Sequence, residues 1–139
     1  MTTSRSDAPV IRIAAAVIVD REGRILLVRK RGTEAFMQPG GKIGSGEEPA
    51  AALARELREE LGCGALSNPR ALGRFIAAAA HEPGCTIEAE LFAIDVDEPI
   101  VPAAEIEEAI WYDRAAQPDL PLAPLTRDYV LPLVEAGHA

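Results

Sequence analysis

The sequence predicts a single mixed α/β domain, and three observations support this fold class. The chain has 139 residues, of which 48% are hydrophobic and 26% are charged, a length and composition typical of one globular domain. Several aliphatic and β-branched runs have the length of strands, whereas one segment repeats its apolar residues with the period of a helix. We therefore expect one domain over residues 10–136, preceded by a flexible tail at residues 1–9.

The first third of the chain predicts a β-hairpin followed by a loop. Aliphatic runs at Ile11–Val19 and Arg24–Arg31 are separated by Asp-Arg-Glu-Gly, a composition typical of a turn. Residues 32–46 then hold Pro39 and several glycines. Because these residue types disfavour helices and regular strands, we expect a loop with at most a short extended piece at Ala35–Gln38.

The next segment predicts the clearest helix of the chain, over Glu47–Leu61. Its alanines and leucines recur on one stripe, Pro49 stands in the first turn, and Gly62 follows the last turn. Downstream, the sequence predicts two strands joined by a turn, a further strand, and a C-terminal helix that Pro132 kinks or splits. These four elements are expected at Ala71–Ala80, Cys85–Val96, Ile106–Tyr112 and Leu125–Ala136.

Charge and hydropathy disfavour several classes of function. The formal net charge is −8 at pH 7, which disfavours nucleic-acid polymers and anionic membranes as partners because both carry negative charge. The longest apolar runs are far shorter than the roughly 20 residues of a membrane-spanning helix. The N-terminal residues also lack the apolar core of a signal peptide. We therefore expect a cytoplasmic protein that binds neither nucleic acid nor membranes.

The two cysteines predict neither a zinc site nor a disulfide framework. Cys63 and Cys85 lack the C-x-x-C spacing, and the chain offers only two histidines to join them. A nucleophilic role for Cys63 would require a nearby base that the sequence does not identify. We interpret Cys63 as a small, buried side chain of the core.

Three glutamates on the predicted helix are its most informative polar feature. At about 100° per residue, Glu56, Glu59 and Glu60 fall within an arc of roughly 100°. Their like charges repel, and a bound cation would remove the repulsion; carboxylate oxygens favour Mg²⁺ or Mn²⁺ over zinc or copper. The alternative is a solvated helix surface, because glutamate is a good helix former. The glycine-rich loop ahead of the helix favours a site, because its backbone groups can hold phosphate oxygens or metal ligands.

The segment from the loop to the end of this helix resembles the Nudix box. Residues Gly41–Cys63, GKIGSGEEPAAALARELREELGC, follow the pattern G-x5-E-x7-R-E-U-x-E-E-x-G-U, where U is aliphatic, and only the final Cys63 is unusual. The resemblance covers 23 of 139 residues. It implies a Nudix-type α/β/α sandwich, with a mixed, curved sheet between the box helix and a C-terminal helix. The other positions of the box are filled by Gly41, Glu47, Arg55, Glu56, Leu57, Glu59, Glu60 and Gly62.

The resemblance also implies a metal site. Glu56, Glu59 and Glu60 would bind the metal, together with the carbonyl oxygen of Gly40. Similar proteins often place a further metal-binding glutamate downstream, and Glu105 is our choice there, against the alternative of an exposed acidic loop. One glutamate would take the proton of the attacking water, and this general base stays open between Glu56 and Glu105.

Other residues are candidates for positioning and substrate binding. We expect Arg55, which we count with the catalytic residues, to pair with Glu47 and fix the loop against the helix, because arginine offers a rigid fork to a carboxylate. Lys42 is a candidate phosphate contact, with an ordinary exposed loop lysine as the alternative. Phe36 and Trp111 are candidates for stacking on a nucleobase, with a place in the core as the alternative.

For the whole protein, the resemblance implies hydrolysis of a nucleoside diphosphate linked to another group. The expected reaction is attack of water on a phosphoanhydride with Mg²⁺, or Mn²⁺ as a substitute. We favour nucleoside triphosphates as the small-molecule partner, with ADP-ribose or another nucleotide sugar as the alternative. A catalytically silent nucleotide sensor and an interaction module are the rival classes. The sequence leaves open whether the domain forms a homodimer.

Overall fold

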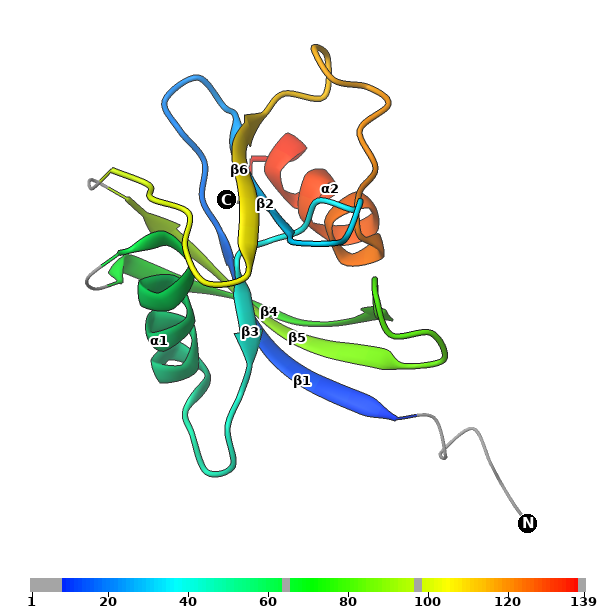
Figure 1. Cartoon of the computed structure of the whole chain (residues 1–139). Helices are drawn as coiled ribbons and strands as arrows, with labels where there is room; N and C mark the ends of the chain where they lie inside the picture. Colours follow the sequence, from blue (N-terminus) through cyan, green and yellow to red (C-terminus); the bar gives the residue numbers. More distant parts are fainter. Residues whose placement is uncertain (1–8, 64–65, 97–98, 138–139) are drawn as a thin grey trace.

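The computed structural model describes residues 9–63, 66–96 and 99–137, so the tail expected at residues 1–9 lies outside the described residues except for Pro9. The predicted mixed α/β fold is confirmed (Figure 1). In chain order the elements are β1 (Val10–Val17), β2 (Ile25–Lys30), β3 (Gly40–Lys42), α1 (Pro49–Leu61), β4 (Ser67–Ala78), β5 (Thr86–Asp95), β6 (Ile106–Tyr112), the π-helical turn η2 (Thr126–Val130) and α2 (Leu131–Glu135).

The strands form two sheets, and this arrangement shows that the predicted hairpin forms only at its tip. One sheet has the order β3-β1-β5-β4, and the other consists of β2 and β6. The expected turn is present, with Gly23 in the left-handed region at φ 83°. Beside it Val19 and Ile25 form an antiparallel bridge, and Leu26 donates its N–H to the Ile18 carbonyl oxygen at 2.9 Å, but β1 and β2 are not neighbours in either sheet. Because β3 and β5 occupy both edges of β1, β2 pairs with β6 instead.

The predicted loop over residues 32–46 contains the short strand β3, which the sequence does not reveal. Its antiparallel register with β1 places Gly40 opposite Ala15. A Cβ atom at Gly40 would collide with the backbone of Ala14 and Ala15, and a φ of 148° also favours glycine at this position. The glycines at this position therefore allow β3 to lie close against β1 and do not mark an irregular loop.

Two apolar cores lie on opposite faces of the larger sheet. Ala14 and Ala16 of β1 belong to the core that contains the buried leucines of α1, whereas Ala15 and Val17 belong to the core that contains the C-terminal helix. Figure 1 shows α1 on one side of the strands and the C-terminal helix on the other. The predicted α/β/α sandwich is confirmed.

Helix α1 begins and ends where local chemistry requires it. The helix starts at Pro49, two residues later than predicted, after an extended Glu48 at φ −70° and ψ 142°. It ends at Gly62, whose left-handed φ of 74° allows its N–H to donate to the Arg58 carbonyl oxygen at 3.2 Å. The glycine predicted to follow the helix thus closes it, and the acidic face of α1 is held in one orientation against the sheet.

The C-terminal helix is irregular at the residue that predicted a kink. Leu131 donates its N–H to the carbonyl oxygen of Thr126, five residues earlier, so the turn is π-helical. Pro132 follows at the start of α2, and it has no N–H to continue an ordinary α-helical ladder. The wider turn therefore accommodates the proline without breaking the helix. No helix of the described residues is long and apolar enough to cross a membrane.

Candidate active site

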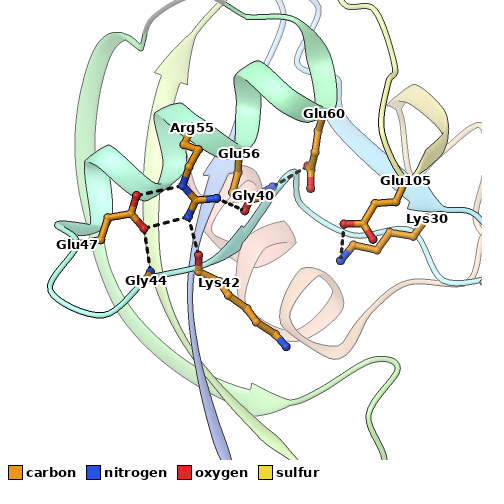
Figure 2. A network of polar contacts seen from close by, with 9 residues as sticks. All are labelled: Lys30, Gly40, Lys42, Gly44, Glu47, Arg55, Glu56, Glu60 and Glu105. Atoms are coloured by element: carbon orange, nitrogen blue, oxygen red, sulfur yellow. Dashed lines mark hydrogen bonds and ion pairs between the residues drawn. The ribbon is translucent and has the colours of Figure 1, made fainter.

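Arg55 joins α1 to the loop that precedes it. Its Nε and Nη2 donate to the two carboxylate oxygens of Glu47 at 3.1 and 2.9 Å, so the predicted pair is present. Its Nη1 donates to Glu56 Oε2 at 2.8 Å, and Nη2 also reaches the Lys42 carbonyl oxygen at 3.1 Å. The Arg55 guanidinium, with the N–H of Gly44, lowers the pKa of Glu47. Arg55 is thus a positioning residue that fixes the loop and orients Glu56 (Figure 2).

Gly41 explains why this loop can lie so close to the acidic face of the helix. A Cβ atom at Gly41 would collide with the carboxyl group of Glu56. Glycine therefore leaves room for that carboxylate between α1 and β3. Any side chain at Gly41, the first glycine of the box, would therefore displace the carboxylate of Glu56, its second glutamate.

Glu60 is the most unusual charged residue of the described chain. Only 1% of its surface is exposed; Oε1 accepts the N–H of Gly40 at 3.2 Å, and Oε2 is buried without a hydrogen-bond partner. The pKa of Glu60 is raised to about 8, chiefly by burial and also by the nearby charges of Glu56 and Glu105, while the Gly40 N–H and Lys30 oppose the shift. A buried oxygen without a partner costs free energy, and a cation beside it would supply the missing interaction.

The other predicted ligands surround Glu60 unevenly. The Glu56 side chain is 15% exposed and bound to Arg55. Glu105 lies across from Glu60 and pairs with Lys30, with 3.7 Å between Glu105 Oε2 and Lys30 Nζ (Figure 2). Glu59, in contrast, is exposed, because it lies at the solvent edge of the predicted arc, about 100° from Glu60.

The three box glutamates therefore do not form a closed cluster. Among the described residues, no three His, Cys, Asp or Glu side chains converge closely enough to hold a metal ion as they stand. The donor set still fits a hard divalent cation, because the unpartnered Glu60 Oε2 lies within the electrostatic reach of Glu56 and Glu105. Among the described contacts, Arg55 holds Glu56 through Oε2, which leaves Oε1 for a cation.

A cleft of about 310 Å³ adjoins this acidic group. Its rim includes Gly40, Lys30, Glu105 and Lys42, and the last was predicted to contact phosphate. Its apolar wall is formed by aliphatic side chains of β1, β5 and the C-terminal helix, namely Ile11, Ile13, Ile87 and Leu125. The cleft thus combines a polar, cationic rim beside Glu60 with an apolar interior.

The two aromatic candidates lie elsewhere. Phe36 is 6% exposed in the core, where the Arg29 guanidinium carbon lies 5.9 Å from its ring centroid, and Trp111 packs against the other core. Neither residue lines the cleft. Stacking on a nucleobase by Phe36 or Trp111 is therefore not supported, because packing of β6 and of the segment before β3 directs both rings inward.

Sequence reasoning missed two groups that line the cleft. Gln38 and Thr126 form a buried pair, in which the Thr126 hydroxyl donates to Gln38 Oε1 at 2.9 Å and Gln38 Nε2 donates to the Ala16 carbonyl oxygen at 3.1 Å. His81, in the turn after β4, borders the cleft. The sequence does contain a signal for Gln38, because it is a polar residue in an otherwise apolar segment just before Pro-Gly-Gly.

Comparison with known proteins agrees with this fold. Residues 10–133 match the NUDIX domain. The 8-oxo-dGTP diphosphatase of Haemophilus influenzae is 42% identical over 65 residues, which are 44% of this chain and 48% of that protein. The CTP pyrophosphohydrolase of Escherichia coli is 31% identical over 129 residues, 89% of each chain. A NUDIX hydrolase from Nitrosomonas europaea superposes with a TM-score of 0.74 at 25% identity, over 94% of this chain and 90% of that one. The chain therefore belongs to the NUDIX family.

Proposed function

We propose that this protein hydrolyses a phosphoanhydride bond of a nucleoside diphosphate derivative, with a divalent cation and with nucleoside triphosphates as the leading substrates. The observation that carries the proposal is the buried Glu60 carboxylate, whose Oε2 has no partner while Oε1 holds the Gly40 N–H at the rim of the cleft. The relatives named as 8-oxo-dGTP diphosphatase and CTP pyrophosphohydrolase support this substrate class. The proposal includes a single domain over residues 10–136. It also includes a cytoplasmic location, where such nucleotides occur.

Glu60 and Glu56 are the proposed principal ligands, with Glu59, Glu105 and the Gly40 carbonyl oxygen completing the set. Mg²⁺ suits these oxygen donors, and Mn²⁺ is the expected substitute. When bound, the cation supplies neutralisation of the phosphate oxygens and a water of lowered pKa. The protein's part is to present ionised carboxylates in one place, so Glu60 must lose its proton while Arg55 holds Glu56 in position.

Glu105 is the better candidate for the general base, a role that it takes only where it does not itself bind the cation. It lines the cleft, and its side chain is 59% exposed, so water and substrate can both reach it. Glu56 Oε2 accepts the Arg55 Nη1 N–H at 2.8 Å, so this oxygen is already engaged in the contact that fixes the loop. Lys30, 3.7 Å from Glu105, holds this carboxylate at the rim and is placed to contact phosphate together with Lys42.

The apolar wall of the cleft is the proposed seat of the nucleobase. Its isoleucines offer flat aliphatic contact, and Gln38 and Thr126 fix the polar part of the wall. A cleft of about 310 Å³ is at the lower end of the size range of small-molecule sites. This favours a nucleoside triphosphate over the bulkier ADP-ribose, because the triphosphate has only one nucleoside to place.

The test is release of phosphate or pyrophosphate from a panel of nucleoside triphosphates, nucleotide sugars, ADP-ribose and dinucleoside polyphosphates with Mg²⁺. We expect one class to be hydrolysed, with Glu60→Gln lowering kcat by about 100-fold or more. Glu48→Gln removes an exposed charge just ahead of the same helix and is the matched control, expected to keep the wild-type rate. Nucleotide binding without turnover, with Mg²⁺ or Mn²⁺, would instead identify a sensor.

A further inference from the structure

Strand β4 forms an edge of the larger sheet that no strand of the described chain covers. β4 is last in the order β3-β1-β5-β4, and Figure 1 shows it beside β5 at the margin of the sheet. Its first half is irregular, because its register with β5 shifts between Ser67 and Arg70 and again between Ala71 and Gly73. From Gly73 to the end of the strand the register is continuous. This second half is therefore a regular edge, open to a further strand.

The backbone of this second half has a defined polarity. The N–H of Ala79 donates to the Cys85 carbonyl oxygen of the neighbouring strand at 3.0 Å. Since antiparallel strands direct alternate residues to one neighbour, Phe75 and Ala77 also face β5. Arg74, Ile76 and Ala78 consequently direct their N–H and C=O groups outward. These are the groups that a further strand would pair.

The side chains along this edge lack the features by which natural edge strands avoid association. Natural edges carry lysines, prolines or bulges, whereas this half has Ile76, 58% exposed, and two alanines. Its one charge, Arg74, donates to Glu90 of β5 at 2.8 Å. On the opposite face, the Tyr129 ring, 39% exposed, lies 5.6 Å from the Phe75 ring. Exposed apolar groups thus flank the open backbone on both faces.

We propose that a second copy of this chain pairs with this edge, antiparallel and about a two-fold axis that sets Ala77 opposite the partner's Ala77. In this register the outward groups of Ile76 face those of the partner's Ala78, and the reverse pair repeats the same bonds. The side chains at this contact are complementary in size, because the large Ile76 meets the partner's Ala78, which is small.

Two features limit the assembly to a closed dimer. The irregular first half of β4 does not offer a continuous ladder. The opposite edge of the sheet is β3, which has only three residues, too few to bind the long edge of another copy. An isologous two-fold pair therefore uses up the open edge, and an open-ended fibre is not formed.

Sedimentation velocity over a concentration series, from low micromolar upward, tests the proposal. We expect the mass to rise from one chain to two and no further. Ile76→Lys should raise the dissociation constant by about tenfold or more, because lysine on an edge opposes pairing. Val101→Lys is the matched control, since Val101 is also 58% exposed but lies outside β4; it should dimerise as the wild type does. The proposal is overturned if the protein is a monomer at every concentration or forms assemblies of more than two chains. It is also overturned if Ile76→Lys leaves the dissociation constant of the dimer unchanged.

The register has its own test, made in a Cys85→Ser background. At the two-fold axis, Ala77 and the partner's Ala77 form a pair that is not hydrogen-bonded, with an expected Cα separation of about 4.5 Å, which a disulfide can span. Oxidised Ala77→Cys should therefore yield covalent dimers joined through the introduced thiols. Ile76→Cys should not, because its two copies lie diagonally and beyond the roughly 7 Å limit. The reverse result would overturn the register.

Discussion

The raised pKa of Glu60 predicts a pH dependence of folding in the metal-free protein. The folded-state pKa is about 8, against an ordinary value of 4.5, so the folded chain binds the proton more tightly than the unfolded chain. The resulting stabilisation is fully present below the ordinary pKa and is lost as the pH rises through about 8. Linkage with these two values gives a loss of about 2–3 kcal/mol in the free energy of unfolding between roughly pH 5 and roughly pH 7.

Urea unfolding in the presence of a chelator, at a series of pH values, measures this loss. Glu60→Gln has no proton to lose and should lack this component of the slope, whereas Glu48→Gln should retain it. The slope is the informative quantity, because the glutamine amide itself is buried beside an unpartnered position and shifts the absolute stability. Mg²⁺ should restore more stability at high pH than at low pH, since it requires the ionised carboxylate. Equal slopes for wild type and Glu60→Gln would refute the assigned titration.

Three further substitutions test the surroundings of the site. Gly41→Ala should lower kcat about 10- to 100-fold, because the added methyl group displaces the Glu56 carboxylate; steady-state kinetics measures this, and an unchanged kcat would argue against a role for Glu56. Arg55→Lys should lower kcat while leaving the free energy of unfolding close to that of the wild type, because the fork is partly exposed and its main role is to position Glu56 and the loop; parallel kinetics and urea unfolding separate the two effects. Thr126→Val should lower the free energy of unfolding by about 1–3 kcal/mol, because it leaves Gln38 Oε1 buried and unpaired. Thr126→Ser keeps the hydroxyl donor and should therefore be more stable than Thr126→Val in the same urea unfolding assay.

The sequence predicts the features of this chain that depend on local chemistry. Helix α1 follows from its apolar period and from Gly62, and the pair of Arg55 with Glu47 follows from the fork geometry of arginine. Helical spacing also places three glutamates on one arc. It does not show which of them is buried, because burial depends on segments distant in the sequence, such as β3, whose Gly40 N–H donates to Glu60 Oε1 at 3.2 Å.

The features that sequence reasoning missed arise from contacts between distant segments. The predicted hairpin is confined to its tip because β1 and β2 each pair with another strand, a choice that local turn chemistry does not encode. Gln38 and Thr126 are 88 residues apart, and no spacing rule connects them. The aromatic residues Phe36 and Trp111 suited either a core or a stacking role, and only the packing of the strands decides between them.

The parallel pairing of β1 with β5 has a consequence for how the protein folds. Val10 lies opposite Thr86, and this register continues along both strands, so β1 cannot be fixed until the chain beyond the Nudix box has been made. During synthesis the apolar residues of β1 therefore stay exposed or transiently associated until β5, whose paired residues lie some 76 positions later in the chain, has been made. A fragment that ends with the box would contain every residue of the motif and yet lack the strand that holds β1, and through it Gly40, in place. The site is therefore expected to form late in folding, as one event with the closure of the sheet.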